Sequence, residues 1–339
     1  NDAATKAAAE ALARLQSEDA AVAAAIAIAA ENKVAGRPLT LTADDIQFGH
    51  ASQQNDGSWN FDTTVSPHNA VRIQAKMSND TANGSIGLFF GPVFGQDDFS
   101  PERTSIAAHL DQEIALVIDR SHSMCFDMSG VSFSYPYGTP RYPDPVAYPP
   151  HNSQSRWAAL ERAMNTFLDV AGSTSTPPRI SMSSFGSDIT LSTYEGRLTG
   201  RTFPALERDA ELSADYGTVR QVIADRGDDI MLGGTTMSVG MDDARAILTG
   251  PNVRPLAKKI MIVFTDGQWN RGRNPIDAAY DAKAEGIKIY TVTFLQAEQS
   301  TMQSVAEITG GQHLHAQTAE ELEEIFRKLA LTLPVVLTE

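Results

Sequence analysis

The strongest constraint on the fold is an alternation of apolar runs and helical patterns that begins at Glu113. Apolar runs that predict strands lie at residues 114–118, 180–185, 260–265 and 287–294, with a shorter one at 312–315. Helical spacing of apolar residues marks residues 155–170, 239–248, 275–285, 300–309 and 319–331. Strands that are apolar throughout and alternate with helices form a mainly parallel sheet with helices on both faces. We therefore predict a doubly wound α/β domain over residues 112–331.

Residues 1–111 have a different pattern and predict a second, smaller α+β domain. Residues 1–34 are Ala-rich and helical in spacing, with Ser17 as an N-cap that restarts the helix after a short break. Alternating runs separated by turn signals follow, and they predict a short antiparallel sheet covered by a long N-terminal helix. The β-branched, apolar end of the chain, residues 332–339, is expected to return to this sheet and complete the smaller domain.

Composition excludes several classes of function. The formal net charge is −15, and an acidic chain without a basic stripe argues against nucleic acid and anionic membranes as partners. The single cysteine, Cys125, allows no intramolecular disulfide and leaves no ligand set for structural zinc. No apolar stretch reaches the ~18–20 residues of a membrane span. Because the chain opens within a helical pattern and without Met, we expect a processed protein or a soluble part of one.

Oxygen-bearing side chains gather where the predicted parallel strands end. The run "IALVI" leads directly into Asp119, and Ser121 and Ser123 follow at alternate positions. Asp266 ends the run "IMIVFT", and a Gly-Gly-Thr-Thr segment at 233–236 precedes a predicted helix. Since the carboxyl ends of parallel strands share one sheet edge, two carboxylates and three hydroxyls should converge there. Hard oxygen ligands suit Mg²⁺, with Mn²⁺ or Ca²⁺ as alternatives. Neutral serine ligands would leave positive charge on the cation for an incoming carboxylate.

These residues resemble the metal-ion-dependent adhesion site of von Willebrand factor A domains, whose order of strands and helices residues 113–331 also follow. The resemblance implies a metal site made of five residues: Asp119, Ser121, Ser123, Thr235 and Asp266. Within the Gly-Gly-Thr-Thr segment it selects Thr235, the third residue, as the ligand. It also implies a coordination position that takes water or an acidic residue of a partner.

A second resemblance covers the rest of the chain. The Ala-rich helix and several phrases are similar to TadG-type proteins of the tight-adherence (Tad/Flp) pilus: "ENKVAGRPLTL", "DDIQFG", "NAVRIQA", "GLFFGPVFG" and "LALTLPVVLTE". Such proteins carry an N-terminal membrane helix, a small pilin-like domain and an A domain. The resemblance therefore implies that residues 1–111 are pilin-like and contact other pilus subunits. It places the protein outside the bacterial cell or on its surface, with any membrane anchor in a segment absent from this chain.

Residues 124–155 form a Tyr- and Pro-rich insertion directly after the last predicted serine ligand. The prolines exclude regular helix or central strand. We expect the insertion to contact a partner, and two alternatives remain open: a loop that selects the partner, or a lid over the metal. The candidate partner-binding residues are Tyr135, Tyr137, Tyr142, Tyr148 and Arg271. His122 is interpreted as a residue of the metal-site rim. Two interpretations stay open for Arg120, Arg271 and Arg273: rim residues that favour an acidic ligand, or solvated surface charges, which are the commoner case.

The sequence favours a noncatalytic, cation-dependent adhesion protein, either a minor or tip component of a pilus or a surface adhesin. It contains no Gly-x-Ser-x-Gly motif and no phosphate-binding Walker loop. Three alternatives stay open: an intracellular A-domain subunit of an ATPase-driven assembly machine, a structural pilus part with a vestigial metal site, and a metal-dependent hydrolase. The sequence does not identify the ligand.

Overall fold

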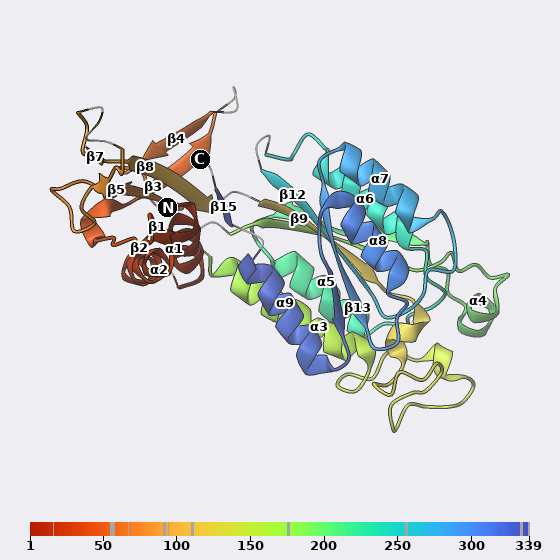
Figure 1. Cartoon of the computed structure of the whole chain (residues 1–339). Helices are drawn as coiled ribbons and strands as arrows, with labels where there is room; N and C mark the ends of the chain where they lie inside the picture. The colour runs from red at the N-terminus through yellow and green to blue at the C-terminus, as the bar shows by residue number, and fades with distance from the viewer. Residues whose placement is uncertain are drawn as a thin grey trace. The chain divides into compact units, whose positions relative to one another are not determined.

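The chain folds into two compact units, which are described separately (Figure 1). The computed structural model describes residues 1–15, 17–54, 58–66, 68–90, 93, 95–109, 112–174, 177–254, 257–332 and 335–337. The smaller unit comprises Asn1–Asp111, Ser173–Thr176 and Leu331–Glu339. The larger unit comprises Gln112–Gly172 and Pro177–Ala330. Within the described residues, no helix is both long and apolar enough to cross a membrane.

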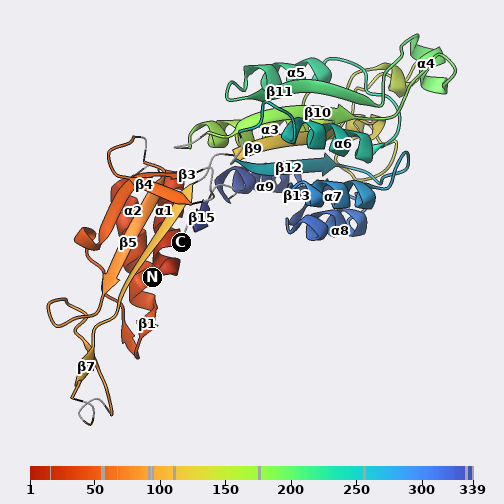
Figure 2. The same ribbon diagram turned by 90° about the horizontal axis from the view of Figure 1, so that it is seen from above.

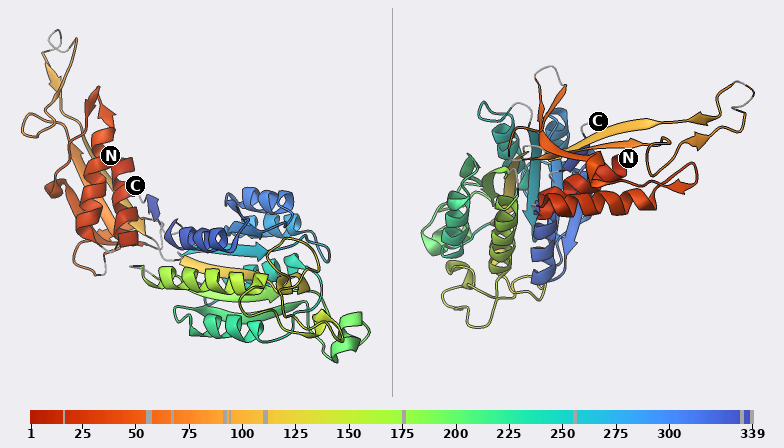
Figure 3. Two further views of the ribbon diagram at one scale, coloured as in Figure 1. Left: turned by 90° about the horizontal axis from the view of Figure 1, so that it is seen from below. Right: turned by 90° about the vertical axis from the view of Figure 1, so that its left-hand side faces the viewer.

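Two helices of similar length, rather than one long helix, open the smaller unit. They are α1 (Asp2–Leu15) and α2 (Glu18–Glu31), and they lie side by side (Figure 3). The expected long helix is broken because Ser17 has an extended backbone, and its hydroxyl accepts a hydrogen bond from the Ala20 N–H at 3.2 Å. Buried alanines such as Ala8 and Ala25 line both helices. Side chains of this size allow the two helices to pack closely together.

The helices cover one face of a five-stranded antiparallel sheet with the order β15–β8–β5–β3–β4. Its strands are β3 (Ile46–Gln53), β4 (Trp59–Asp62), β5 (Ala70–Lys76), β8 (Glu102–His109) and β15 (Val335–Leu337). Alternate residues of β5, Val71, Ile73 and Ala75, point toward the alanines of the helices, as the period of two predicts. The C-terminal strand β15 runs antiparallel to β8, with Val335 opposite His109.

Short elements complete the smaller unit. They are β1 (Lys33–Val34), β2 (Arg37–Pro38), a 3₁₀ turn at Ala43–Asp45, β6 (Ile86–Gly87) and β7 (Asp98–Phe99). Strands β6 and β7 pair with each other in a two-stranded ribbon, which extends away from the main sheet of this unit (Figure 2). Exposed phenylalanines, Phe89 and Phe90, follow β6 directly and contact each other edge to face.

The larger unit is built on a six-stranded sheet with the order β11–β10–β9–β12–β13–β14. Its strands are β9 (Gln112–Asp119), β10 (Arg179–Phe185), β11 (Leu206–Ser213), β12 (Lys258–Thr265), β13 (Lys288–Phe294) and β14 (His313–Ala316). Neighbouring strands are parallel except for β11, which runs antiparallel to β10. The mainly parallel α/β fold expected from the sequence is therefore confirmed.

Helices cover both faces of this sheet (Figure 1). They are α3 (Arg156–Gly172), α5 (Gly217–Gly227), α6 (Met237–Leu248), α7 (Pro275–Ala284), α8 (Ser300–Thr309) and α9 (Ala319–Thr332). The short helix α4 (Tyr194–Thr199) lies beyond the end of the sheet (Figure 2). On one face, Ala115 and Val117 of β9 pack in a cluster with residues of α6, α7 and α8. On the other face, Phe264 of β12 lies 6.3 Å from the ring of Phe326 in α9. Burial on both faces explains why the central strands are apolar throughout.

Sequence patterns missed the edge of the larger sheet. Strand β11 contains three consecutive charged residues, at 207–209, and Ala210 is its one buried residue, so it lacks the apolar run that marked the other strands. Helix α5 buries only Val219 and Ile223. Edge elements of this kind are held by ion pairs more than by apolar burial: Arg226 of α5 pairs with Glu207 and Asp209 of β11.

We predict that removing residues 333–339 will destabilise the smaller unit, because β8 would lose its neighbour β15 and become a sheet edge. Hydrogen exchange should accelerate across residues 39–78. Exchange within β10 of the larger unit serves as the internal control and should not change. Unchanged protection across residues 39–78 in the truncated chain would show that the pairing of β15 adds nothing to the smaller unit.

Candidate metal centre

Two buried carboxylates lie at the same edge of the larger sheet. Asp119 is the last residue of β9, and Asp266 directly follows β12, the parallel neighbour of β9. The side chain of Asp119 accepts two hydrogen bonds, from the Ser121 N–H at 2.8 Å and from the Thr265 hydroxyl at 2.6 Å. Both aspartates are buried. The sheet therefore brings two negative charges together away from water.

Serine hydroxyls connect these carboxylates. The Ser121 and Ser123 hydroxyl oxygens lie 2.9 Å apart. The Ser123 hydroxyl also donates to Oδ1 of Asp266 at 2.7 Å. One short loop after β9 thus places its two hydroxyls in a row that reaches the end of β12.

Glycines position the threonine segment against this loop. Gly233 has φ +85°, and a Cβ there would lie 2.4 Å from the Ser187 hydroxyl, so the position requires glycine. The Gly233 carbonyl accepts a hydrogen bond from the His122 N–H at 3.0 Å. Gly267, which directly follows Asp266, lies close to both hydroxyls. A Cβ at this position would be 3.7 Å from the Thr235 hydroxyl oxygen and 3.8 Å from the Ser123 hydroxyl oxygen. All five residues implied by the resemblance therefore converge at one place.

An arginine that the sequence analysis missed holds one of the carboxylates. Nη1 of Arg156, the first residue of α3, lies 2.8 Å from Oδ2 of Asp266, and both side chains are buried. Its Nε donates to the Asp127 carbonyl at 3.2 Å, and its guanidinium lies over the Phe126 ring. The sequence did contain one signal for this role: Arg156 stands at the start of a helix, directly after the insertion. Oδ1 of Asp266 faces Ser123 and is not taken by the arginine.

The electrostatics of the site fit a divalent cation. Burial, and then the nearby charge of Asp266, raise the pKa of Asp119 to about 7. A cation between the two carboxylates would compensate the negative charge that burial makes costly. Within the described residues no group of three or more His, Cys, Asp or Glu side chains is placed to hold a metal, so hydroxyls must supply the other ligands. Two carboxylates and three hydroxyls are a hard-oxygen donor set.

The insertion is tied through His122 to residues 120–123, the short loop after β9 that is called the metal loop below. His122 is largely buried, and it lines the cleft beside this loop. Its Nδ1 lies 2.8 Å from the Met231 carbonyl, and its Nε2 lies 2.8 Å from the Tyr135 hydroxyl. Burial lowers the pKa of His122. A neutral ring fits these partners, with Nδ1 donating to the carbonyl and Nε2 accepting from the tyrosine.

The four candidate tyrosines divide into two pairs. Tyr137 and Tyr142 are 95% and 87% exposed and remain free to contact a partner. The hydroxyls of Tyr135 and Tyr148 are engaged within the protein, with His122 and with the Tyr142 carbonyl. Two of the four candidate tyrosines therefore also support the insertion itself.

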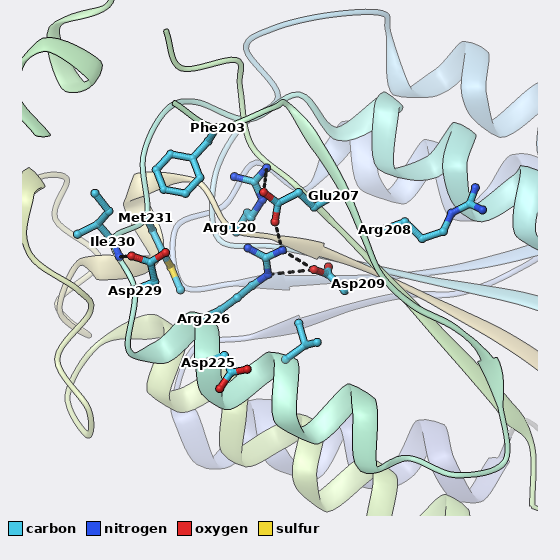
Figure 4. A pocket seen from close by; sticks show the side chains of 11 residues that line it. Arg120, Phe203, Glu207, Arg208, Asp209, Asp225, Arg226, Asp229, Ile230 and Met231 are labelled. Carbon is cyan, nitrogen blue, oxygen red and sulfur yellow. Dashed lines mark hydrogen bonds and ion pairs between the residues drawn. The ribbon is translucent and has the colours of Figure 1, made fainter. Parts of the chain in front are cut away.

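A cleft of about 610 Å³ opens beside the candidate metal ligands. It is lined by Ser121, Ser123 and Thr235 on one side and by insertion residues, including Phe133, on the other. The exposed Arg271 also lines it, as expected of a rim residue. Arg120 is not at the rim. It is buried and lines a separate cavity of about 470 Å³ with Glu207 and Arg226 (Figure 4).

Comparison with known families agrees with this architecture. Residues 207–328 match the family model of the von Willebrand factor type A domain. Residues 3–107 match the model described as Putative Tad-like Flp pilus-assembly. The two matches cover separate parts of the chain: the first lies within the larger unit and the second within the smaller one.

Individual relatives are distant. The uncharacterized protein YwmC of Bacillus subtilis (strain 168) is 28% identical over 78 residues, which are 22% of this chain and 34% of that protein. This chain therefore spans about a third of that relative. The pilus adhesin SpaC from Lactobacillus rhamnosus GG, in its open conformation, is 14% identical over 89% of this chain and 40% of that chain, with a TM-score of 0.47. Proximal thread matrix protein 1 of the mussel byssus, described with a zinc-occupied MIDAS motif, is 14% identical over 69% and 49% of the two chains, with a TM-score of 0.46.

We predict that Mg²⁺ binds at one site and that Asp119→Asn abolishes the binding measured by calorimetry. The amide keeps the shape of Asp119 and removes its charge. Its oxygen can accept from the Ser121 N–H, while its NH2 group replaces the acceptor of the Thr265 hydroxyl and donates to that oxygen instead. Thermal stability in chelator should not fall, because the repulsion with Asp266 is relieved. Glu307→Ala, at an exposed position on α8, is the matched control and should bind Mg²⁺ as the native protein does. Unchanged affinity in Asp119→Asn would disprove the site assignment.

We also predict that the cost of removing Arg156 depends on the cation. In chelator, Arg156→Met should lower the free energy of unfolding of the larger unit by about 3 kcal/mol, because Asp266 is left buried and unpaired. Saturating Mg²⁺ should reduce this loss, since the cation then compensates Asp266. Denaturant titrations with and without Mg²⁺ measure both values. Arg162→Met, at an exposed position of α3, should cost little in either condition. An equal loss for Arg156→Met in both conditions would separate the arginine from the metal site.

Proposed function

We propose that this protein is a noncatalytic, divalent-cation-dependent adhesion protein of a bacterial surface, and a minor or tip component of a Tad/Flp-type pilus. The observation that carries the proposal is the convergence of two buried carboxylates and three hydroxyls at one edge of a von Willebrand A sheet. Asp119, Ser121, Ser123, Thr235 and Asp266 would hold Mg²⁺, or Mn²⁺ or Ca²⁺ in its place.

The donor set favours binding over catalysis. Hydroxyl ligands add no negative charge, and Arg156 already pairs with Asp266, so the site as a whole would keep positive charge around a divalent cation and attract a carboxylate of a partner. Hydrolysis would require a base placed to activate water or a serine. His122 lies in the metal loop, but both its ring nitrogens are engaged, with the Met231 carbonyl and the Tyr135 hydroxyl. It is therefore not available to take a proton from Ser121 or Ser123.

The insertion would select the partner. One carboxylate on a metal gives a strong contact but little selectivity, and specific interfaces bury about 800 Å² on each partner. The exposed Tyr137 and Tyr142 offer rigid aromatic area, and Arg271 adds a positive charge at the cleft. The hydrogen bond between His122 and Tyr135 favours a fixed wall beside the metal over a lid that covers it.

The smaller unit would attach the protein to other pilus subunits. Its match to a Flp pilus-assembly model supports this role. Its β6–β7 ribbon presents exposed apolar side chains, among them Phe89 and Phe90, which solvent alone does not explain. Asp98, at the start of β7, adds negative charge to the ribbon, so a partner subunit with an apolar pocket and a basic rim would fit it. Such a role places the protein outside the cell or at its surface.

Attachment of the producing bacterium to a surface tests this function. Native cells should attach in Mg²⁺ and detach in chelator, and cells that carry Asp119→Asn should attach poorly in both. Cells with Glu307→Ala should attach as native cells do. If Asp119→Asn cells make normal pili and attach normally, the metal site is vestigial and the protein is a structural part. If they lack pili altogether, a role in assembly replaces the adhesive one.

A further inference from the structure

Phe133 has a backbone conformation that bulky residues rarely adopt, yet its side chain faces solvent. Its φ is +60° and the residue is 72% exposed. It is the third residue of a turn closed by a hydrogen bond of 3.3 Å from the Ser134 N–H to the Val131 carbonyl. Glycine or asparagine is the usual residue at such a position, because positive φ costs a side chain free energy. An exposed phenyl ring gains little from folding to offset that cost.

The turn is held by Asp127. The Asp127 N–H donates to the Ser134 carbonyl at 2.8 Å, and the Ser134 hydroxyl returns a bond of 2.5 Å to the Asp127 carboxylate. The same carboxylate accepts the Ser129 N–H at 2.9 Å. These bonds fix the conformation of Phe133 from both sides. Strained residues that are fixed in this way are typical of binding sites.

Phe133 is also connected rigidly to the metal loop. Its ring centroid lies 5.2 Å from that of the buried Phe126, which contacts His122 at 5.4 Å and Tyr135 at 5.2 Å. His122 stands between the two serine ligands in the sequence. Phe133 lines both the cleft of about 610 Å³ beside the metal residues and a hollow of about 860 Å³ within the insertion. A chain that enters the cleft can therefore contact this ring.

We propose that Phe133 is the specificity-determining anchor of the cleft, which binds a protein segment whose metal-coordinating acidic residue is accompanied by a large apolar or aromatic side chain. That side chain packs on Phe133 while the carboxylate completes the coordination of the cation. Asp144 and Glu195 line the same cleft and disfavour a second acidic side chain in the segment. This inference rests on the cation-dependent binding proposed above and adds the chemistry of the partner.

Immobilised hexapeptides test the proposal. One set carries a single Asp with Phe or Leu at each neighbouring position in turn, and the other set carries Ser there. In Mg²⁺, the native protein should bind the best Phe or Leu peptide at least about tenfold more tightly than its Ser counterpart. Phe133→Ser should lose this preference and keep its Mg²⁺ affinity. Tyr280→Ser removes an exposed aromatic residue from α7 and should keep the preference.

A glycine variant separates binding from structure. Phe133→Gly removes the cost of positive φ, so its melting temperature should stay within about 2 °C of the native value or rise, while the preference is lost. A large fall in melting temperature would make Phe133 structural and overturn the inference. A preference that is absent from the native protein, or retained in Phe133→Ser, would overturn it while leaving cation-dependent binding intact. If no Asp peptide binds in a Mg²⁺-dependent way, the proposed function fails and the inference fails with it.

Discussion

The larger unit depends on how it compensates two carboxylates buried at the end of its sheet. Asp119 ends β9 and Asp266 follows the neighbouring strand β12. Burial, and then the nearby charge of Asp266, raise the pKa of Asp119 and oppose its ionisation. The chain compensates them from two sources, the backbone and hydroxyl donors around Asp119 and the guanidinium of Arg156. In the proposed function, a cation held by the remaining oxygens would be a third. Arg156 takes Oδ2 of Asp266 and leaves Oδ1 to the serine row. The same carboxylate of Asp266 is therefore both neutralised by Arg156 and oriented toward the other candidate ligands.

The insertion belongs to the same arrangement. Arg156 begins α3 directly after the insertion and bonds the Asp127 carbonyl within it. His122 links the metal loop to Tyr135 from the other side. The first half of the insertion is therefore held by two residues, one of which belongs to the metal loop and the other of which pairs with the carboxylate of Asp266. This explains how a Tyr- and Pro-rich segment without regular secondary structure can keep a fixed position beside the site.

Sequence patterns predicted what depends on local order and missed what depends on long-range contact. Asp119, Ser121 and Ser123 share one short motif, and parallel strands necessarily bring Asp266 to the same edge. The Gly-Gly pair marked the threonine segment because only glycine fits there, as the contact between Gly233 and Ser187 explains. Arg156 was missed because only folding brings it to a residue 110 positions away. Strand β11 was missed because ion pairs replace apolar burial at a sheet edge.

The pairing of β15 with β8 has a mechanical consequence. The chain leaves the sheet of the smaller unit after β8, forms the larger unit, and returns to that sheet at β15. Val335 lies opposite His109, so both connections join the sheet at the same end of these two strands. A pulling force applied at the metal face is thus divided between two covalent connections. The part of this force that acts on β8 is resisted by the pairing of β8 with β5, which extends over seven residue pairs. A cut in either connection would leave the larger unit covalently attached through the other.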